Sequence, residues 1–392
     1  MVNLEIKRPP HLVPSYSLTG DLLSFLRCHR QYRFYNGSSL PPSRPVQLWY
    51  GEFVHGVLEA AYRIWQAGDP PPTFPWPCTP SEWGENTPER VAHDIGEIGD
   101  RIEFVLKAQG KDARSRLARR AAYHRAAAAV NELGSLLFPL IADAETKVIG
   151  TRSLPKIEGR PAIRADRYEV HGVIDVVTQV SLANVARGNA IRTEIEAACA
   201  NLPDEFEVIA DYKGASRPDL SSPYWSQGDW QVQTYAWLRR HQAQGVPIVA
   251  GVLLYIDELA PSTETIRDIQ HQIKNNDTDV LPVPGSDDDV VLRNWKPGQD
   301  TSQLSLAFRL RRAIRVIPVT EQSLEVATAA FDGVVRNIEE NIELEFAQGE
   351  IPGAWAANCT DGNTCVACDF RHFCPTPGPT NQPVSIGIPQ AP

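Results

Sequence analysis

Two short segments carry side chains that could hold a metal ion beside an ammonium group. The segment 171–175 lies within a pattern of alternating apolar residues and ends in Asp175, and the segment 208–213 ends a second such pattern. Side chains two positions apart on a strand face the same side, so we expect Asp211 and Lys213 to point into one site. Asp175, on a neighbouring strand, could join them.

These residue types could together support the hydrolysis of a phosphodiester bond. Two carboxylates on adjacent strands can hold one or two Mg²⁺ ions through oxygen ligands. A metal so placed can activate water and neutralise charge on a scissile phosphate, while Lys213 could orient the water or stabilise the developing charge. The alternative is that Asp211 and Lys213 form a solvated ion pair, which is the usual role of an Asp-x-Lys pattern.

Two flanking segments add polar side chains to this set. Gln231 and Tyr235 lie four residues apart in a segment with helical character, and therefore on one helix face. Upstream, the segment 51–55 places His55 in the first turns of an expected helix, after Gly51.

Taken in order, the four segments resemble the RecB-like branch of the PD-(D/E)XK nuclease superfamily, which includes the CRISPR-associated RecB-like exonucleases and the nuclease domains of RecB and AddB. The family pattern is G-x-x-x-H, then G-x-x-D, then D/E-x-K, then Q-x-x-x-Y. The matching segments are Gly51 to His55, Gly172 to Asp175, Asp211 to Lys213, and Gln231 to Tyr235.

The resemblance implies a role for each of these residues. The ligands of Mg²⁺ or Mn²⁺ would be His55, Asp175, Asp211 and the backbone carbonyl of Tyr212. Lys213 would assist the attacking water, and Gln231 and Tyr235 would contact DNA or brace the site. Glu145, on the strand before the hairpin, would be a further acidic group of the site or a surface charge at a strand edge.

The cysteines are concentrated near the C-terminus. The seven are Cys28, Cys78, Cys199, Cys359, Cys365, Cys368 and Cys374. An odd count in a chain expected to be cytosolic argues against a disulfide framework and favours metal or cluster ligation at the clustered end. The Cys-x2-Cys pair at 365–368 is a common metal knuckle. With Cys374 it supplies three thiolates, and the fourth ligand would be either Cys359 or Cys28.

The cysteine spacing, with Cys28 followed by Tyr32, also resembles the iron–sulfur staple of the AddB and CRISPR-associated exonuclease branch. The resemblance implies a [4Fe-4S] cluster that ties the N-terminal and C-terminal helices together. Its ligands would be Cys28, Cys365, Cys368 and Cys374. Four thiolates suit Zn²⁺ equally well, so zinc is the alternative. Cys78 and Cys199 are expected to be free thiols.

The net charge of −10 excludes a general basic coat for nucleic acid, so DNA binding would need local positive surfaces. The most basic stretch is 101–125, where Arg116 and Arg120 share a helix face. A second basic segment contains Arg311 and Arg312. Both segments could follow a phosphate backbone, or they could be solvated helix faces.

Segments whose apolar residues have helical spacing alternate along the chain with segments whose apolar residues recur at every second position. This pattern predicts an α/β fold. Hydrophobic residues make up 42% of the chain and charged residues 22%, an ordinary globular composition. Helices are expected at 15–35, 51–67, 97–142, 229–243, 304–316 and 321–348, and strands at 144–150, 162–170, 173–180, 207–212 and 249–256. The resemblance implies a restriction-endonuclease-like core, a central mixed sheet flanked by helices, with helical insertions and a cysteine-cluster subdomain built from both ends.

The expected organisation follows the chain. It comprises N-terminal helices with Cys28 and His55 (15–66), a proline-rich loop and basic helical insertion (67–142), a nuclease core (143–256), an irregular acidic insertion (257–303), C-terminal helices with the cysteine cluster (304–375) and a flexible tail (376–392). The longest apolar run is too short for a membrane-spanning helix, and the N-terminus lacks a signal-peptide-type apolar region, so a cytoplasmic protein is expected.

The sequence therefore predicts a metal-dependent DNA nuclease. The resemblance implies an exonuclease that prefers single-stranded DNA or DNA ends and acts in DNA repair, recombination or antiviral (phage) defence, with a helicase or a defence-system protein as partner. Two alternatives belong to other classes. One is a catalytically silent DNA-binding or scaffold subunit of a larger nuclease complex, and the other is a zinc-binding interaction protein.

Overall fold

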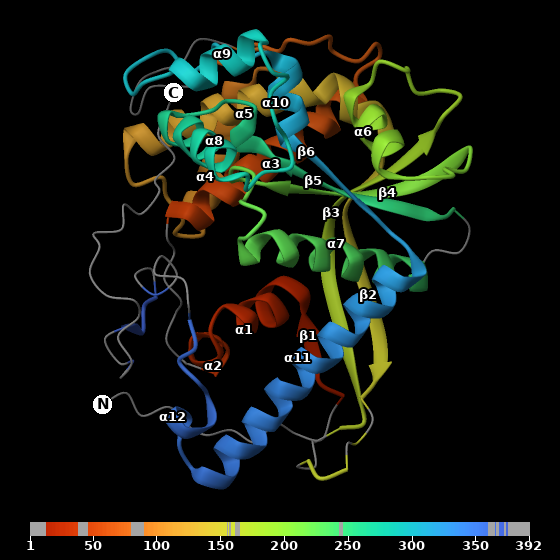
Figure 1. Cartoon of the computed structure of the whole chain (residues 1–392), viewed down its shortest axis with the longest axis vertical. Helices are drawn as coiled ribbons and strands as arrows, with labels where there is room; N and C mark the ends of the chain where they lie inside the picture. Colours follow the sequence, from red (N-terminus) through yellow and green to blue (C-terminus); the bar gives the residue numbers. More distant parts are fainter. Residues whose placement is uncertain are drawn as a thin grey trace.

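The fold is an α/β arrangement in which a mixed sheet is flanked by helices on both faces (Figure 1). It is seen in a computed structural model of the whole chain. The structure describes residues 13–37, 46–79, 90–154, 156, 158–160, 165–242, 246–359, 365, 368–371 and 374. Among the helices in these ranges, none combines the length and apolarity needed to span a membrane.

The sheet is built around a long central hairpin. Within the described residues its strands are β1 (Ser15–Ser17), β2 (Ile141–Ser153), β3 (Arg167–Ser181), β4 (Glu205–Lys213), β5 (Ile248–Tyr255) and β6 (Ile314–Pro318). Strand β3 pairs antiparallel with β2 along one edge, and its other edge is shared by β1, which is parallel, and β4, which is antiparallel. Strand β5 runs parallel to β4, and β6 closes the order antiparallel to β5.

The helices form two groups that cover opposite faces of this sheet. Their bounds are α1 (Leu23–Arg27), α2 (His29–Gly37), α3 (Val46–Ala67), α4 (Ile95–Ala108), α5 (Arg116–Leu137), α6 (Ala190–Ala198), α7 (Pro223–Gln242), α8 (Thr263–Asn275), α9 (Asp287–Asn294), α10 (Leu306–Ala313), α11 (Glu321–Gln348) and α12 (Ile351–Ala354). In Figure 1, α3, α4 and α5 lie above the sheet, and α1, α7 and α11 lie below it.

Alternation along the strands divides the core between the two faces. In β4, Val208 and Tyr212 pack in the cluster built by α3, α4 and α5, whereas Ile209 packs in the cluster built by α1, α7 and α11. Because side chains alternate along a strand, the residues of the same parity as Ile209 must also face α7. This parity includes Asp211 and Lys213.

Helix α7 lies unusually close to the sheet because glycines remove the intervening side chains. A Cβ atom added at Gly251 on β5 would lie 1.5 Å from Cγ1 of Val232 on α7. A Cβ added at Gly228 on α7 would lie 2.7 Å from Cδ1 of Leu253 on β5. These two close approaches set the distance between α7 and the sheet, and therefore how far the polar side chains of α7 extend toward the strands.

Several expectations from the sequence are confirmed and others are wrong. The helices expected at 51–67, 229–243 and 321–348 and the strands at 207–212 and 249–256 are present with small shifts at their ends. The segments 162–170 and 173–180 were expected as two strands, but their described part belongs to the single strand β3. The expected helix at 304–316 ends at Ala313, and β6 follows directly.

Two regions contain helices that the sequence does not predict, and one expected helix is interrupted. The segment 257–303 was expected to be irregular but contains α8 and α9, each capped at its N-terminus by a serine side chain. The polar segment 184–206 contains α6, which is capped by Asn189. The expected helix at 15–35 is instead the strand β1, one π-helical turn and two short α-helices that are separated at Cys28.

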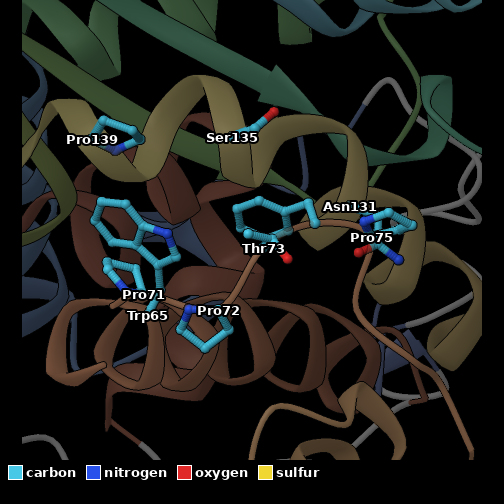
Figure 2. Close-up of a pocket in the computed structure, with 9 residues that line it drawn as sticks. Trp65, Pro71, Pro72, Thr73, Pro75, Asn131, Ser135 and Pro139 are labelled. Atoms are coloured by element: carbon cyan, nitrogen blue, oxygen red, sulfur yellow. The ribbon is translucent and has the colours of Figure 1, made fainter. Parts of the chain in front are cut away.

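The proline-rich segment is non-helical over its described residues 68–79, as its composition predicts. It passes over α3 and α5 and leaves a hollow of about 520 Å³ between them. Figure 2 shows Trp65 of α3 beside Pro71 on one side of this hollow and Ser135 of α5 on the other. The end of the expected loop and the tail 376–392 lie outside the described residues.

Candidate active site

The candidate site lies where the carboxyl ends of the parallel strands β4 and β5 meet. Lys213 pairs in register with Tyr255, so both strands end at the same edge of the sheet. On β3, the pairing with β1 ends at His171 and the pairing with β4 begins at Val176. The segment 172–175 lies between the two, and this brings Asp175 next to the end of β4.

Asp211, Lys213 and Gln231 form a closed set of polar contacts on the α7 face. The Lys213 Nζ lies 2.5 Å from Oδ2 of Asp211 and donates a hydrogen bond of 2.6 Å to Oε1 of Gln231. The Gln231 Nε2 donates in turn to Oδ1 of Asp211 over 2.9 Å. The amide of Gln231 therefore fixes the carboxylate and the ammonium relative to each other.

His55 joins this set from the opposite face through the backbone of β4. Its Nε2 lies 2.9 Å from the carbonyl oxygen of Tyr212, and its Nδ1 lies 3.3 Å from Oδ2 of Asp175. The same Asp175 oxygen accepts a hydrogen bond of 2.8 Å from the Tyr212 backbone N–H. All four residues that the sequence suggests as metal ligands are therefore neighbours in the structure.

Of the two motif glycines, Gly172 has a steric reason to be there and Gly51 has none. A Cβ atom at Gly172 would lie 2.6 Å from Cε1 of Tyr235, so the glycine leaves room for the tyrosine ring. A Cβ atom at Gly51 would meet nothing within 4 Å. Just after β4, a Cβ atom at Gly214 would lie 3.1 Å from the ring of Tyr50, so the chain leaving β4 passes close to α3.

The electrostatics of the site are those of charges withdrawn from water. Burial raises the pKa of Asp211, and the adjacent Lys213 only partly offsets that shift. Burial alone would lower the pKa of His55, but Asp175 and Asp211 outweigh it and raise the pKa to about 9. Oδ2 of Asp211 is buried and accepts no hydrogen bond in the described part of the chain, although Lys213 lies beside it as an ion pair.

Tyr235 and Glu145 complete the surroundings. Burial raises the pKa of Tyr235, and the charges of Asp211 and Asp175 raise it further, so its phenol stays protonated. Glu145 lies opposite Asp175 in the β2–β3 register, since Ala144 pairs with Val176 and Thr146 with Ile174. Its φ of 54° is left-handed, and burial and the charge of Asp175 raise its pKa. Glu145 is therefore part of the site's acidic surroundings.

A cleft of about 740 Å³ opens directly beside the end of β4. It begins at Gly214, and Tyr50, Arg125 and Asp257 line the wall nearest the site. The Tyr50 hydroxyl donates to Asp257 over 2.7 Å, and Nε of Arg125 lies 3.1 Å from the same carboxylate. None of the sequence motifs contains these three residues. Asp257 follows the end of β5 as Gly214 follows β4, and the rule that sites lie at the carboxyl ends of parallel strands could have found it.

The break between α1 and α2 buries Cys28, and the C-terminal segment packs beside it. The backbone N–H of His29 donates to the side chain of Asn358 over 2.9 Å. Further along α2, the ring of Phe34 lies 4.8 Å from that of Phe370. The segments that carry the cysteines at the two ends of the chain are therefore in contact.

The thiols themselves interact across this contact. Burial, a hydrogen bond with Cys359 and the charges of Cys28 and Cys368 raise the pKa of Cys365 to about 12. Burial also raises the pKa of Cys368, and Cys28 adds to the shift. Cys374 is half-buried, and its backbone N–H donates to the carbonyl of residue 371 over 3.3 Å. Cys359, the local alternative suggested by the sequence, is thus a direct partner of Cys365.

The arginines suggested as phosphate contacts have different surroundings. Arg116 and Arg120 are exposed on α5, and Arg311 is exposed on α10. Arg312 is 1% exposed, and its guanidinium is paired with the equally buried Glu258. The expectation that Arg312 contacts nucleic acid is therefore wrong, because its charge is used inside the fold.

Within the ranges that the structure describes, no group of three or more His, Cys, Asp or Glu side chains is arranged as a metal-binding site. Comparison of the chain with models of known protein families and with curated proteins finds no match.

Proposed function

We propose that this protein is a metal-dependent nuclease that hydrolyses phosphodiester bonds at the site formed by Asp175, Asp211 and Lys213. The observation that supports this best is the closed set of contacts among Asp211, Lys213 and Gln231, with His55 and Asp175 one hydrogen bond away. Burying a carboxylate and an ammonium costs desolvation free energy that their mutual attraction repays only in part, so a stabilising role does not explain this pair well. The sheet and its flanking helices are compatible with a restriction-endonuclease-like core.

The donor set suits a small divalent cation. Two carboxylates, one imidazole nitrogen and one backbone carbonyl oxygen match the preferences of Mg²⁺ and Mn²⁺ for oxygen with some nitrogen. The buried Oδ2 of Asp211 lies 2.5 Å from the Lys213 ammonium, so this oxygen already faces positive charge and would be shared between Lys213 and the metal. The metal would be held by Asp175, Asp211, His55 and the Tyr212 carbonyl. When bound, it would activate water and neutralise charge on the scissile phosphate.

The remaining side chains act by position and charge. The Lys213 ammonium, held by Gln231, would stabilise the negative charge that develops on the phosphate as water adds and the P–O bond to the leaving oxygen breaks. Gln231 fixes the distance between Lys213 and Asp211, so it is a positioning residue. Tyr235 keeps its proton and fills the space left by Gly172, which braces α7 against β3.

We propose that the substrate is DNA and that single strands and DNA ends are preferred. We propose that cleavage is exonucleolytic. This choice comes from the resemblance of the four motifs to RecB-like nucleases. The same resemblance leads us to propose a role in DNA repair, recombination or phage defence, with a helicase or a defence-system protein as partner.

We further propose that the protein carries a [4Fe-4S] cluster held by Cys28, Cys365, Cys368 and Cys374, with Zn²⁺ as the alternative occupant. Support comes from the donor chemistry. Cys28 raises the pKa of both Cys365 and Cys368, and Cys368 raises that of Cys365, because their negative charges would be close together. A positively charged cluster or metal would relieve that repulsion.

The proposal is tested by a nuclease assay on end-labelled single-stranded and double-stranded DNA. Anaerobically purified protein is assayed with Mg²⁺, Mn²⁺ or EDTA, beside the variant Asp211→Ala/Lys213→Ala. We expect metal-dependent cleavage that falls by at least about 10³-fold in the double variant, because the cation ligand and the charge-stabilising group are both lost. The ladder of products distinguishes cleavage from an end from internal cleavage.

The matched control is Glu207→Gln. Glu207 lies on the same strand and pairs with Arg239 of α7, as Asp211 contacts Gln231 of the same helix. Arg239 is about two helical turns of α7 farther from the site than Gln231. Its variant should cleave like the wild type. Activity that survives in the Asp211→Ala/Lys213→Ala variant would contradict the proposed site. A folded, iron-containing protein that cleaves nothing would favour a silent scaffold subunit.

A further inference from the structure

The insertion formed by α4, α5 and their connection has an outer surface rich in exposed cations. Within residues 101–124, all of which the structure describes, every exposed charged side chain is cationic. We call this the basic surface, and it comprises Arg101, Lys107, Arg114, Arg116 and Arg120. The acidic residues of the same segment are half-buried, and Glu103 pairs with the buried Arg119. Arg101 is paired with Glu97 one turn earlier on α4, so its charge is partly offset. On a chain of net charge −10, such a surface selects a polyanion.

An exposed aromatic ring lies within this surface. Phe104 is 76% exposed, the largest value among the big apolar side chains that the structure describes. Val105, the next residue in the chain, and Leu117 on α5 are 52% and 50% exposed. On α4, Phe104 lies three residues from Arg101 and three from Lys107, and therefore on the same side of the helix. An aromatic ring surrounded by cations suits a ligand that has both phosphates and accessible planar bases, because bases stack on such rings whatever their identity.

The basic surface is connected to the candidate active site through α3. Helix α4 packs on α3 closely enough that a Cβ atom at Gly56 would lie 3.0 Å from Ile102. Lys111, in the connection between α4 and α5, forms an ion pair with Glu52 of α3. Glu52 precedes His55 by less than one helical turn, or about 4.5 Å along the axis. A strand on this surface would therefore lie close to the site.

We infer that the basic surface, with Phe104 between Arg101 and Lys107, binds the single-stranded nucleic acid that the site cleaves, holding its phosphates by arginine and lysine and one of its bases by stacking. This inference rests on the proposed function, because it assumes that a nucleic-acid strand enters the site. The single strand is favoured over the duplex because paired bases are stacked on each other and cannot stack on Phe104. A duplex would use only the cations.

The test measures binding separately from cleavage. The fluorescence anisotropy of a labelled oligothymidine and of a labelled duplex is followed with the whole chain in EDTA. We expect Phe104→Ala to weaken single-strand binding on the order of tenfold and to leave duplex binding unchanged. Arg116→Glu/Arg120→Glu should weaken both and reduce the slope of log K against log salt for the single strand by about 1.4, or about 0.7 for each lost phosphate contact.

Matched controls come from exposed residues of the same types elsewhere. Phe346→Ala removes a ring that is 48% exposed on α11, and Arg267→Glu/Lys274→Glu reverses two exposed charges on α8. Both should bind like the wild type.

The outcomes separate this inference from the proposed function. Weakened binding in the Phe104 and arginine variants supports the surface even if the chain proves unable to cleave. Cleavage of DNA together with unchanged binding in both variants would overturn the surface and leave the nuclease intact. Loss of binding only in the arginine variant, equal for both DNAs, would also overturn it, since that pattern indicates a duplex or an acidic protein as the ligand.

Discussion

At the scale of single residues, the candidate site depends on contacts that each motif makes with another motif. The Gln231 amide bridges Asp211 and Lys213, and His55 contacts both Asp175 and the carbonyl of Tyr212. Every member therefore holds its geometry through a partner from a different segment of the chain. Substitution of one member should disturb the others, as is usual for groups that act as a unit.

Gly172 provides a test of this interdependence that does not depend on activity. Gly172→Ala would place a methyl group 2.6 Å from the ring of Tyr235. We expect it to lower the free energy of unfolding by about 1–3 kcal/mol, because neither the strand nor the packed ring can move away easily. Urea denaturation measures the change.

The control for this variant is Gly188→Ala, because a Cβ atom there would meet nothing within 4 Å. Its effect should stay within about 0.5 kcal/mol. In a Tyr235→Leu background the cost of Gly172→Ala should shrink, since the ring that causes the clash is gone. An equal cost in both backgrounds would show that strand conformation, rather than the Tyr235 ring, requires the glycine.

At the scale of secondary-structure elements, buried ion pairs hold the N-terminal helices against the long C-terminal one. Arg33 of α2 makes two hydrogen bonds of 2.6 Å to the carboxylate of Glu345 on α11. The Trp355 indole donates a third to the same carboxylate over 2.6 Å. Arg33 and Glu345 are both buried. Removing one partner therefore leaves a charge without water or a counterion.

We expect Arg33→Met to lower the free energy of unfolding by about 3–5 kcal/mol, because Glu345 would remain buried and uncompensated. The double variant Arg33→Met/Glu345→Leu should recover much of this loss, since no charge is then buried. Both are measured by urea denaturation. The contrasting pair is Arg240 with Glu321, whose carboxylate is 84% exposed, and Arg240→Met should cost no more than about 1 kcal/mol. Equal costs for the two arginines would mean that the α2–α11 pair is hydrated in solution.

At the scale of the whole molecule, a segment near the N-terminus contacts one near the C-terminus. Cys28 at the break between α1 and α2 interacts with Cys365 and Cys368, which lie more than 300 residues away in the sequence. A cluster bound there would cross-link the ends as a long-range staple. Such a link stabilises mainly by restricting the unfolded chain, and the restriction grows with the length of the loop that it closes.

We expect Cys28→Ser to lose iron and to lower the melting temperature by several degrees, because the staple is opened at its N-terminal side. Iron, sulfide and zinc contents of the purified protein and a thermal melt measure both effects. Cys78→Ser, which changes an exposed cysteine of the proline-rich segment, should change neither. Iron retained in Cys28→Ser would show that Cys28 is not a ligand.

The same measurement decides between the two candidates for the last ligand. Cys374→Ser should lose iron and Cys359→Ser should retain it if the cluster follows the spacing in the sequence. The reverse result would favour Cys359, which the structure places in contact with Cys365. Zinc in place of iron would indicate the alternative metal, and neither metal in the wild type would contradict the staple.

Much of the site could be predicted from the sequence because its residues lie on regular elements. Period-two alternation is enough to put Asp211 and Lys213 on one face of a strand, and helical spacing is enough to align Gln231 with Tyr235. The same local rules located α3, α7 and α11. They fail where the outcome depends on distant partners, as at β6, which follows a helix without a break and becomes a strand because it pairs with β5.

Local sequence patterns are enough to select the candidate residues and to say which face of its own element each one occupies, because a face depends on neighbours a few positions away. Which helices and strands contact each other depends on the tertiary packing of the whole chain. In the tertiary structure, His55 contacts the end of β4, and Cys28 lies near the C-terminal thiols. Arg312 is buried against Glu258, whereas Arg116 and Arg120 are exposed. The physical reason is that such contacts are selected by the packing of two apolar cores against one sheet, which no local pattern encodes.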